Sequence, residues 1–507
     1  MLNLDQIRSR WSLQISYVAS ALLFAAPVTN PARAQVTSRV VLGAATTFTT
    51  LCSSCHGSEL QGGQGPALIG PGYFHGIDDE SVARSIREGF PAKGMPAWSA
   101  SLSEGQILGL VSFLRDQRIA VLPDRLAKLD AELKNNLHSL RVTSELESFR
   151  VDVVAETGKP WGIAALPDGR VLVTEEAGAL RVIDHGQLLP NPVEGTPRGT
   201  PPTDHFKRAL LDVEVHPDYQ RNGWIYLTAA QQIDIGSGAS KTQVSLLRGR
   251  LRGGAWVDSK VLATLDVETG TARVAFDDSH HVYVSTSSGP GVDGVTGAAP
   301  LTPEQLLRTP PQDLTNPRGK IMRWNDDGTV PTDNPFVQTS NALPTIWSYG
   351  HRNPQGLSFD RKTQELWSTE HGPRGGDELN WIRGGHNYGW PVVSYGTRYD
   401  GLPVTSEVEH EGMDQPVINW TPAIAVSAIS FYEGKAFPRW QHSLLIGSLL
   451  NQELLRVVIR KQQAVVQELL LRDMGRIRAI TTGSNGDIYV ALELKQQGLV
   501  VRLSPAK

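Results

Sequence analysis

The motif Cys52-Ser53-Ser54-Cys55-His56 carries the most specific chemistry in this 507-residue sequence. Its C-x-x-C-H spacing places two thiols one helical turn apart, where they can bond the two vinyl groups of a haem. The adjacent imidazole of His56 can then ligate the iron. A metal or redox site built on C-x-x-C alone is the alternative, but the following histidine favours haem. We therefore predict one covalent c-type haem.

A sixth iron ligand is expected downstream of this motif. Met95 lies in the stretch Gly94-Met95-Pro96-Ala97-Trp98, which glycine and proline keep from being helical. A thioether ligand would raise the reduction potential of the haem relative to a second histidine. The alternative is that Met95 only fills the domain core. The chain has five methionines and no other near the motif, so we predict axial ligation by this one.

The residues around these ligands predict a small all-α domain. Four apolar residues at helical spacing within residues 103–115 indicate an amphipathic closing helix. Its inward side chains are Ile107, Leu108, Val111 and Leu114. The segment from about residue 36 to residue 117 resembles class I cytochromes c, including the loop that carries the methionine. We therefore expect a cytochrome c domain over residues 35–118.

The N-terminal segment has the pattern of an export signal. Arg8 and Arg10 precede an apolar run over about residues 15–28, and an A-x-A triplet ends at Ala34. This is the order of a secretory signal peptide, and the run is too short for a spanning helix. We predict that residues 1–34 are cleaved and that the mature protein is periplasmic, with no transmembrane span. An uncleaved anchor is the alternative, and it leaves the body on the same side of the membrane.

Composition limits the class of partner. A formal net charge of -4 gives no general attraction to nucleic acid or to an anionic membrane. Both cysteines of the chain lie in the haem motif, so no disulfide framework is available to the remaining residues. Small-molecule substrates and redox proteins are therefore the partners that we expect.

Chain length predicts more than one folded unit, because a single hydrophobic core rarely serves so many residues. A stretch rich in Lys, Asp and Glu follows the cytochrome-like segment. Leu126, Leu129 and Leu133 stand there at helical spacing. We predict a linker helix over residues 119–146.

The pattern of the remaining residues predicts an all-β domain. A strand, turn, strand phrase is clearest at residues 162–174 and recurs loosely to the end of the chain. Further copies start near residues 211, 273, 356 and 479. Repeats of this kind predict a β-propeller, and six blades of about 60 residues would fill residues 147–507. A β-sandwich with coincidental turns is the alternative. The predicted fold class is multidomain, a small all-α cytochrome c domain followed by an all-β six-bladed β-propeller.

Three stretches of this body, residues 349–357, 370–380 and 387–391, closely resemble the soluble quinoprotein glucose and aldose sugar dehydrogenases of the glucose/sorbosone dehydrogenase family. In that family a six-bladed propeller holds pyrroloquinoline quinone (PQQ) over its channel, with calcium at the quinone oxygens. The resemblance implies oxidation of an aldose at its anomeric carbon to a lactone.

Arg352 and Asn353 are the residues that the resemblance places at the quinone. PQQ carries three carboxylates and an electrophilic ortho-quinone. A fixed guanidinium beside an amide can hold the anion and polarise a carbonyl. The resemblance therefore implies that both residues bind the cofactor and that Arg352 takes part in catalysis.

Two calcium ions are implied by the same resemblance. The carbonyls of Gly372 and Pro373 match those that hold the calcium at the quinone, and Glu378 with the Tyr388 carbonyl matches a second, structural calcium. Calcium is a hard cation that prefers such oxygen ligands. A solvated charged turn over residues 374–378 is the alternative interpretation.

The chain departs from the family where a general base is needed. Family members use an imidazole to take the proton from the anomeric hydroxyl, and Thr269 stands at that position. A threonine hydroxyl cannot act as a base near neutral pH. Ser288 also replaces a family carboxylate. Glu268 and His205 are the predicted replacement bases, with His371 as a third candidate, and for each the alternative is a solvated loop residue.

These features together predict a periplasmic quinohaemoprotein dehydrogenase. A sugar or related alcohol or aldehyde would reduce PQQ, held with calcium, and electrons would pass to the haem. A downstream redox protein or respiratory chain component would receive them next. The alternative is an electron-transfer or ligand-binding protein whose propeller has lost turnover, which the replacement by Thr269 favours.

Overall fold

The computed structural model describes residues 38–68, 79–120, 140–197, 209–236, 239–267, 271–289, 301–398 and 403–506. The predicted signal peptide and most of the predicted linker helix lie outside these ranges, so both stay predictions. Among the described residues, none of the helices has the length and apolar content needed to cross a membrane.

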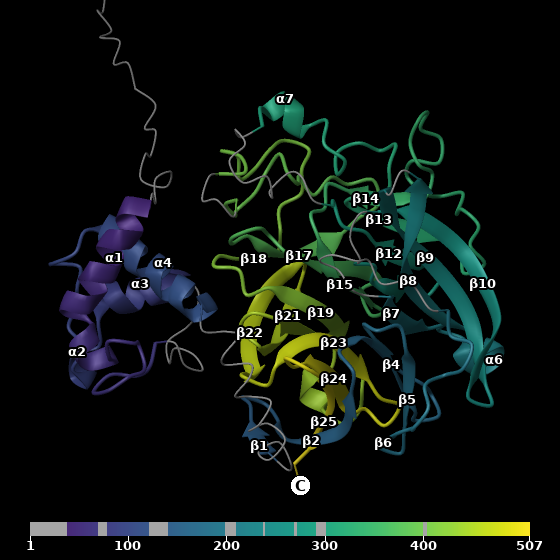
Figure 1. Ribbon diagram of the computed structural model, residues 1–507, viewed down its shortest axis with the longest axis horizontal. Helices are drawn as coiled ribbons and strands as arrows, with labels where there is room; N and C mark the ends of the chain where they lie inside the picture. Colours follow the sequence, from purple (N-terminus) through teal and green to yellow (C-terminus); the bar gives the residue numbers. More distant parts are fainter. Residues whose placement is uncertain are drawn as a thin grey trace, which may run out of the picture. The chain divides into compact units, whose positions relative to one another are not determined.

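The first folded part is all-α, as predicted, and appears in purple and blue in Figure 1. Its elements are α1 (Ser38–Leu51), α2 (Ser53–His56), α3 (Asp79–Glu88), the 3-10 helix η2 (Pro91–Lys93) and α4 (Glu104–Ala120). Ser103 starts α4 through a capping box, because its backbone N–H donates to Gln106 Oε1 at 2.9 Å and its hydroxyl accepts from the Gln106 N–H. Helix α4 matches the expected closing helix but continues to Ala120.

The core of this helical domain forms where α4 packs on α1. Ile107, Val111 and Leu114 are buried as expected, whereas Leu108 is only half-buried. The rings of Phe48 and Phe113 meet at a centroid distance of 5.5 Å across the two helices. The apolar face of α4 therefore holds the domain together.

Six β-sheets form the second part, which confirms the six-bladed propeller. The first blade holds β3 (Pro160–Ala165), β4 (Val171–Glu175), β5 (Leu180–Asp184) and β6 (Gln187–Leu188). The second blade holds β7 (Leu210–Val215), β8 (Ile225–Gly236), β9 (Ala239–Arg252) and β10 (Ala255–Asp266). The third blade holds β11 (Val274–Phe276), β12 (Val282–Ser285), β13 (Lys320–Trp324) and β14 (Ile346–Tyr349). The fourth holds β15 (Pro354–Asp360), β16 (Glu365–Glu370), β17 (Asp377–Ile382) and β18 (Ile418–Trp420); the fifth β19 (Val426–Phe431), β20 (Leu444–Ser448), β21 (Leu454–Arg460) and β22 (Gln463–Leu471). Short helices α6 (Tyr219–Asn222), α7 (Pro303–Leu306) and η3 (Pro438–Trp440) lie in the connections.

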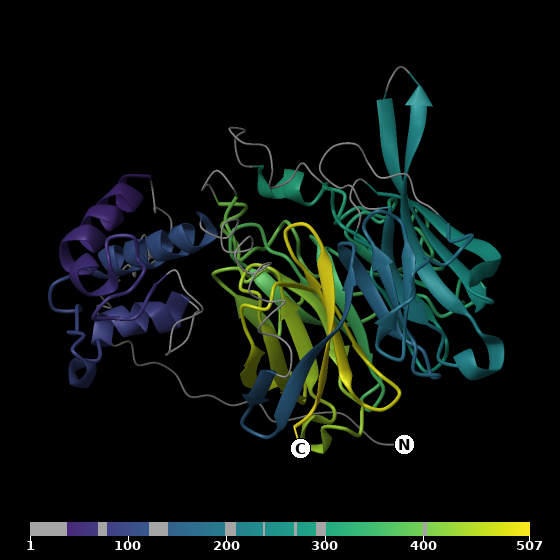
Figure 2. The same ribbon diagram turned by 60° about the horizontal axis from the view of Figure 1, so that its bottom comes forward.

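The sixth blade closes the ring by joining the two ends of the propeller, whose blue and yellow strands run side by side in Figure 2. Its strand order is β1-β2-β25-β24-β23, so β2 (Ser148–Thr157) pairs antiparallel with β25 (Gly498–Pro505). The other members are β1 (Leu140–Thr143), β23 (Arg476–Thr482) and β24 (Ile488–Glu493). Strand β1 lies within the predicted linker helix, so the expectation of helix up to residue 146 was wrong there. Antiparallel pairing with β2 decides the conformation of this short segment.

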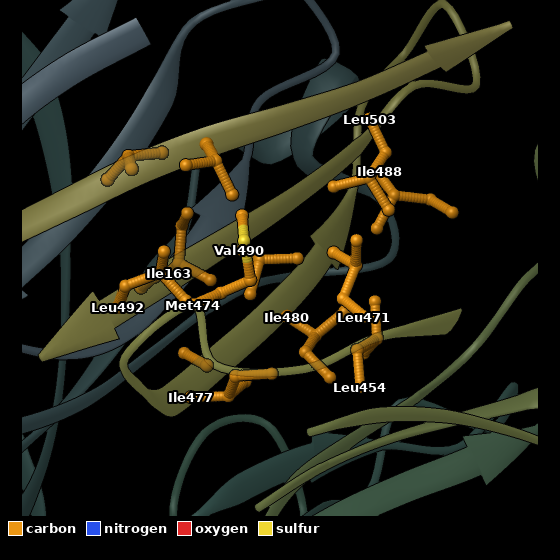
Figure 3. Packing of buried hydrophobic residues seen from close by; sticks show 14 of the residues in the cluster. Ile163, Leu454, Leu471, Met474, Ile477, Ile480, Ile488, Val490, Leu492 and Leu503 are labelled. Atoms are coloured by element: carbon orange, nitrogen blue, oxygen red, sulfur yellow. The ribbon is translucent and has the colours of Figure 1, made fainter. Parts of the chain in front are cut away.

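Apolar side chains fill the spaces between blades. Figure 3 shows one such cluster, in which Ile163 of β3, Leu454 of β21 and Ile488 of β24 pack together although they come from three different blades. Threonine hydroxyls on the second strand of three blades donate hydrogen bonds to carbonyl oxygens of the next blade. The donors are Thr174, Thr228 and Thr369, and their acceptors are Leu211, Ala272 and Ser427. The blades are thus joined both by packing and by buried polar contacts.

The first strand of each blade lines the central channel. Strands β3, β7, β11, β15, β19 and β23 contact one another in succession, and β23 contacts β3 to complete the circle. Each blade repeats the same antiparallel order, so the N-terminal ends of these six inner strands meet at one mouth of the channel. The cavity along the axis has a volume of about 40 Å³. That is far smaller than the few hundred Å³ of a typical pocket for an organic ligand, so we look for the cofactor site at a mouth of the channel.

Candidate active site

The haem motif lies at the junction of α1 and α2. The Cys52 and His56 N–H groups donate to the carbonyls of Phe48 and Cys52 at 2.8 and 3.0 Å, so the motif is helical and the two thiols stand one turn apart. Both cysteines are free and half-buried. Burial raises the pKa of the Cys52 thiol to about 11, with the Cys55 thiol adding to the rise.

The imidazole of His56 is held in the orientation that an iron ligand needs. Its Nδ1 lies 2.8 Å from the carbonyl oxygen of Pro66, which fixes the Nδ1–H tautomer and leaves the Nε2 lone pair for a metal. A Cβ at Gly65 would lie 2.8 Å from the imidazole Cε1, so only glycine leaves the ring this position. These residues fit a covalent haem.

Met95 stands in the loop that the sequence indicates. It follows Gly94, whose φ of 84° requires the left-handed region, and it pairs with Phe90 in an isolated β-bridge. The side chain is half-buried, and Trp98 packs on the apolar core nearby. Iron ligation by Met95 stays a prediction.

At the propeller, the predicted cofactor residues lie together at the channel mouth. Arg352 and Asn353 directly precede the inner strand β15, and His371 follows β16. Arg352 Nη1 donates to the His371 carbonyl at 2.9 Å, and the His371 N–H donates to the Asn353 carbonyl at 3.1 Å. The Thr271 hydroxyl donates to Asn353 Oδ1 at 3.1 Å, which orients the amide so that its NH₂ group points away from Thr271.

Two arginines that the sequence reasoning missed also reach this mouth. Arg476 and Arg478 open β23, the inner strand of the sixth blade, and both interact with Glu493. The guanidinium of Arg478 lies over the indole of Trp161 at 4.8 Å. Both guanidinium groups therefore lie near the same carboxylate. The sequence feature that could have identified these two residues is the R-x-R pair at the start of an inner strand.

His371 is a neutral imidazole in this cationic environment. Burial lowers its pKa to about 3, and the charges of Arg352, Arg478 and Arg476 add to this shift. Its Nε2 atom is buried and has no hydrogen-bond partner among the described residues. The residue as a whole is half-buried, so this histidine is not a fully solvated loop residue, and its role as a base stays a prediction.

The loop from Gly372 to Gly376 is a cradle of backbone oxygens. A Cβ at Gly372 would lie 2.2 Å from the Gly375 carbonyl oxygen and 2.3 Å from that of Gly376, so no side chain fits there. Asp377 accepts from the Gly372 and Val426 N–H groups, at 3.0 Å each. Burial raises the pKa of Asp377 to about 7. Carbonyl and carboxylate oxygens in this density suit a hard cation.

Glu378 faces a second carboxylate across the sheet. It lies opposite Glu370 in the β16/β17 register. Burial raises the pKa of Glu370 to about 8 and that of Glu378 well above its ordinary value. Asn380 Nδ2 donates to Glu378 at 3.0 Å, while Asn380 Oδ1 is buried with no hydrogen-bond partner among the described residues. A cation would satisfy both the carboxylate pair and that oxygen.

Tyr388 belongs to the same buried region. Its ring stacks on His351 at 4.6 Å, and His351 Nδ1 lies 3.2 Å from Glu370 Oε2. The solvated-turn alternative therefore fails for the buried Asp377, whereas Glu378 is half-buried and Arg374 is exposed. No cluster of three or more His, Cys, Asp and Glu side chains suited to a metal occurs in the described part of the chain, so calcium here would need carbonyl and amide oxygens as well.

The predicted replacement bases Glu268 and His205, and Thr269 itself, lie outside the described residues. Ser288 is described and buried; its N–H donates to the Arg352 carbonyl at 2.8 Å and its hydroxyl to the Gly289 carbonyl at 3.3 Å. Ser288 thus supports the backbone of Arg352 and brings no carboxylate to the mouth.

Comparison with known proteins assigns both parts. Residues 157–502 match the family described as glucose / sorbosone dehydrogenase. The chain belongs to this family. Residues 41–114 match the cytochrome c family described as cytochrome c oxidase, cbb3-type, subunit III, so the chain joins a cytochrome c domain to a dehydrogenase propeller.

Named relatives of the family cover the propeller. The aldose sugar dehydrogenase YliI of Escherichia coli is 33% identical over 354 residues, which are 68% of this chain and 90% of that protein. The quinoprotein glucose dehydrogenase B of Acinetobacter calcoaceticus is 24% identical over 67% of this chain and 84% of that protein. The crystal structure of the apo aldose sugar dehydrogenase from Escherichia coli has a TM-score of 0.62 and 31% identity, covering 71% of this chain and 100% of that one.

Proposed function

We propose that this protein is a periplasmic quinohaemoprotein dehydrogenase. It oxidises a sugar or a related alcohol or aldehyde with PQQ at the propeller mouth, and it passes the electrons to a haem c in the helical domain. The observation that carries the proposal is the cationic cluster of Arg352, Arg476 and Arg478 at the mouth, in a family member whose chain also carries the C-x-x-C-H motif.

The mouth suits PQQ by charge and by hydrogen bonding. Three guanidinium groups can bind the carboxylates of the cofactor. The amide NH₂ of Asn353, oriented by Thr271, can donate to a quinone oxygen. The Gly372 and Pro373 carbonyls would hold calcium at the same end. PQQ supplies an acceptor for two electrons when it is bound.

Oxidation of an aldose to its lactone releases two electrons and two protons. A residue of this chain must accept the proton of the anomeric hydroxyl, and Glu268 and His205 remain our candidates for that role. The haem would accept one electron at a time and would be reoxidised by a downstream redox protein between the two transfers, while the protons would leave to solvent. The covalent link between the two domains keeps the haem at a high effective concentration for this transfer.

The test uses the purified chain with its covalent haem. PQQ and calcium chloride are added, followed by a series of aldoses, alcohols and aldehydes, and haem reduction is followed by visible absorption. We expect reduction only when PQQ and a substrate are both present. Absence of haem reduction with every substrate, despite PQQ binding, would refute electron transfer from the propeller to the haem.

The second candidate function is a binding or electron-transfer protein with a lapsed propeller. Ser288 favours it, because a family carboxylate is absent from a described and buried part of the mouth. An artificial electron acceptor separates the two functions. Sugar-dependent dye reduction without haem reduction indicates an active propeller with a broken transfer step, whereas neither reduction indicates the lapsed propeller.

A further inference from the structure

One guanidinium, that of Arg273 in the third blade, bonds to residues of four of the other five blades below the cofactor mouth. Arg273 directly precedes the inner strand β11, and 4% of the residue is exposed. Its Nε donates to the Gln355 carbonyl at 2.6 Å, and its Nη2 donates to the Arg478 carbonyl at 2.6 Å. Its Nη1 donates to the Trp161 carbonyl and to Asp212 Oδ1, at 3.1 Å each. The acceptors come from β15, β23, β3 and β7.

Asp212 completes this contact across the axis. Its Oδ2 accepts from the Val274 N–H at 2.9 Å, so the carboxylate binds both the side chain and the following residue of Arg273. Burial raises the pKa of Asp212 and Arg273 opposes that rise, so each partner stabilises the charged form of the other. A Cβ at Gly162 would lie 2.7 Å from Asp212 Oδ1, so β3 must carry glycine there.

The bonded residues are those that build the mouth. Gln355 lies two residues after Asn353, and the Arg478 that supplies a carbonyl also supplies a guanidinium to the mouth. Trp161 is contacted on its ring by Arg273 at 5.1 Å and by Arg478 at 4.8 Å. The axial cavity that Arg273 and Asp212 line has a volume of only about 40 Å³, so these side chains narrow the channel at this layer.

We propose that Arg273 is a positioning residue for the cofactor mouth, which fixes the backbones that carry Asn353, Arg478 and Trp161 relative to one another. This inference rests on the proposed function, because the groups so positioned would bind PQQ. Lysine cannot replace arginine here, since an ammonium lacks the planar fork that reaches four acceptors in different blades.

A buried arginine of the fifth blade supplies the matched control. Arg456 of β21 is 2% exposed, and it donates to Glu468 at 2.7 Å and to Ser443 at 3.2 Å. Its partners lie in the fifth blade and not on the axis. Arg273→Lys and Arg456→Lys therefore both disturb a buried guanidinium, and only the first disturbs the mouth.

The experiment measures PQQ affinity in the presence of calcium chloride and amide hydrogen exchange without PQQ, in the full chain. We expect Arg273→Lys to weaken PQQ binding at least tenfold and to raise exchange in β3, β15 and β23. Arg456→Lys is expected to keep the affinity within twofold of wild type and to raise exchange in β21 and β22. If Arg273→Lys does not fold, Asp212→Asn tests the same contact and should weaken binding at least threefold.

The outcomes separate this inference from the proposed function. If Arg273→Lys, or Asp212→Asn in its place, binds PQQ within twofold of wild type, the positioning role is refuted. If the wild-type chain binds no PQQ, the proposed function fails instead. In that case the hydrogen-exchange measurement alone tests the positioning role of Arg273, and unchanged exchange in β3, β15 and β23 refutes that role.

Discussion

The haem site and the propeller mouth are built by opposite means. At the haem, the two thiols and the imidazole lie within five consecutive residues, and a short helix places them correctly. At the mouth, Trp161, Arg273, Arg352 and Arg478 come from four different blades and meet only because the ring closes. A local motif can keep its geometry while distant parts change, whereas the mouth depends on every blade between its residues.

The largest expected effect is loss of the haem site without change in the propeller mouth. Cys52→Ala combined with Cys55→Ala removes both attachment points, so covalent haem should be lost completely. The propeller should keep its unfolding temperature and its PQQ affinity. Haem staining after denaturing electrophoresis, together with calorimetry, measures both. A loss of propeller stability would show that the two sites are less independent than their construction implies.

Opening the ring should break the mouth and spare the haem. Val151 of β2 is fully buried and lies opposite Leu503 of β25 at the closure. Val151→Asp places an unpaired carboxylate there, and we expect a loss of about 4 kcal/mol in the free energy of unfolding of the propeller. Denaturant unfolding followed by tryptophan fluorescence and by haem absorption separates the two parts. Arg150→Asp, on the same strand but half-exposed, is the control and should cost much less.

Replacing one cation at the mouth should have a smaller effect than opening the ring. Arg352→Met removes a charged donor from the proposed PQQ site, and a hydrogen bond to a charged group is worth about 2–3 kcal/mol, or roughly 30- to 150-fold in affinity. Titration of PQQ in the presence of calcium measures the change. Arg361→Met, which removes a half-exposed arginine paired with Asp278 at the far end of β15, should leave the affinity unchanged.

The smallest expected effect concerns pH. Glu214 faces the axial cavity, and burial raises its pKa to about 8, with Asp212 adding to the rise and Arg361 opposing it. The folded state then holds a proton that the unfolded state loses above its ordinary pKa of about 4.3. Stability should therefore fall as pH rises from about 4.3 to about 8, and should change little above that.

Glu214→Gln should remove the Glu214 part of this slope and leave the parts that come from Asp377 and Glu370. The variant is expected to unfold at a higher temperature than wild type at pH 9 and at the same temperature near pH 4, as measured by calorimetry across that range. Glu411→Gln, which changes an exposed carboxylate, is the control. Equal slopes for wild type and Glu214→Gln would show that Glu214 is solvated in the folded protein.

Local patterns predicted a large part of the molecule. The C-x-x-C-H motif, the closing helix and the recurring strand phrase each depend on near neighbours in sequence, and each was found where expected. The resemblance also placed Arg352 and Asn353 at one mouth. Strand β1 was misassigned because its four residues are set by pairing with β2, a contact that no pattern within the segment reveals.

The carboxylate pair of Glu370 and Glu378 shows the same limit. The sequence suggested a solvated turn as one possibility for Glu378, because charged residues usually face water. Cross-strand register instead places the two residues opposite each other, with Glu370 buried and Glu378 half-buried. Sequence order could not show this, since the pairing of β16 with β17 sets which residues face each other.

By itself, the sequence determined the haem motif, the alternation of strand and turn, and the family of the propeller, because these depend on side-chain types at short spacing. Only the tertiary structure decided that Arg273 meets four other blades, that Arg476 and Arg478 join Arg352 at one mouth, and that the axis holds only a small cavity. The physical reason is ring closure. Residues far apart in sequence become neighbours only when the last blade pairs with the first strands of the propeller.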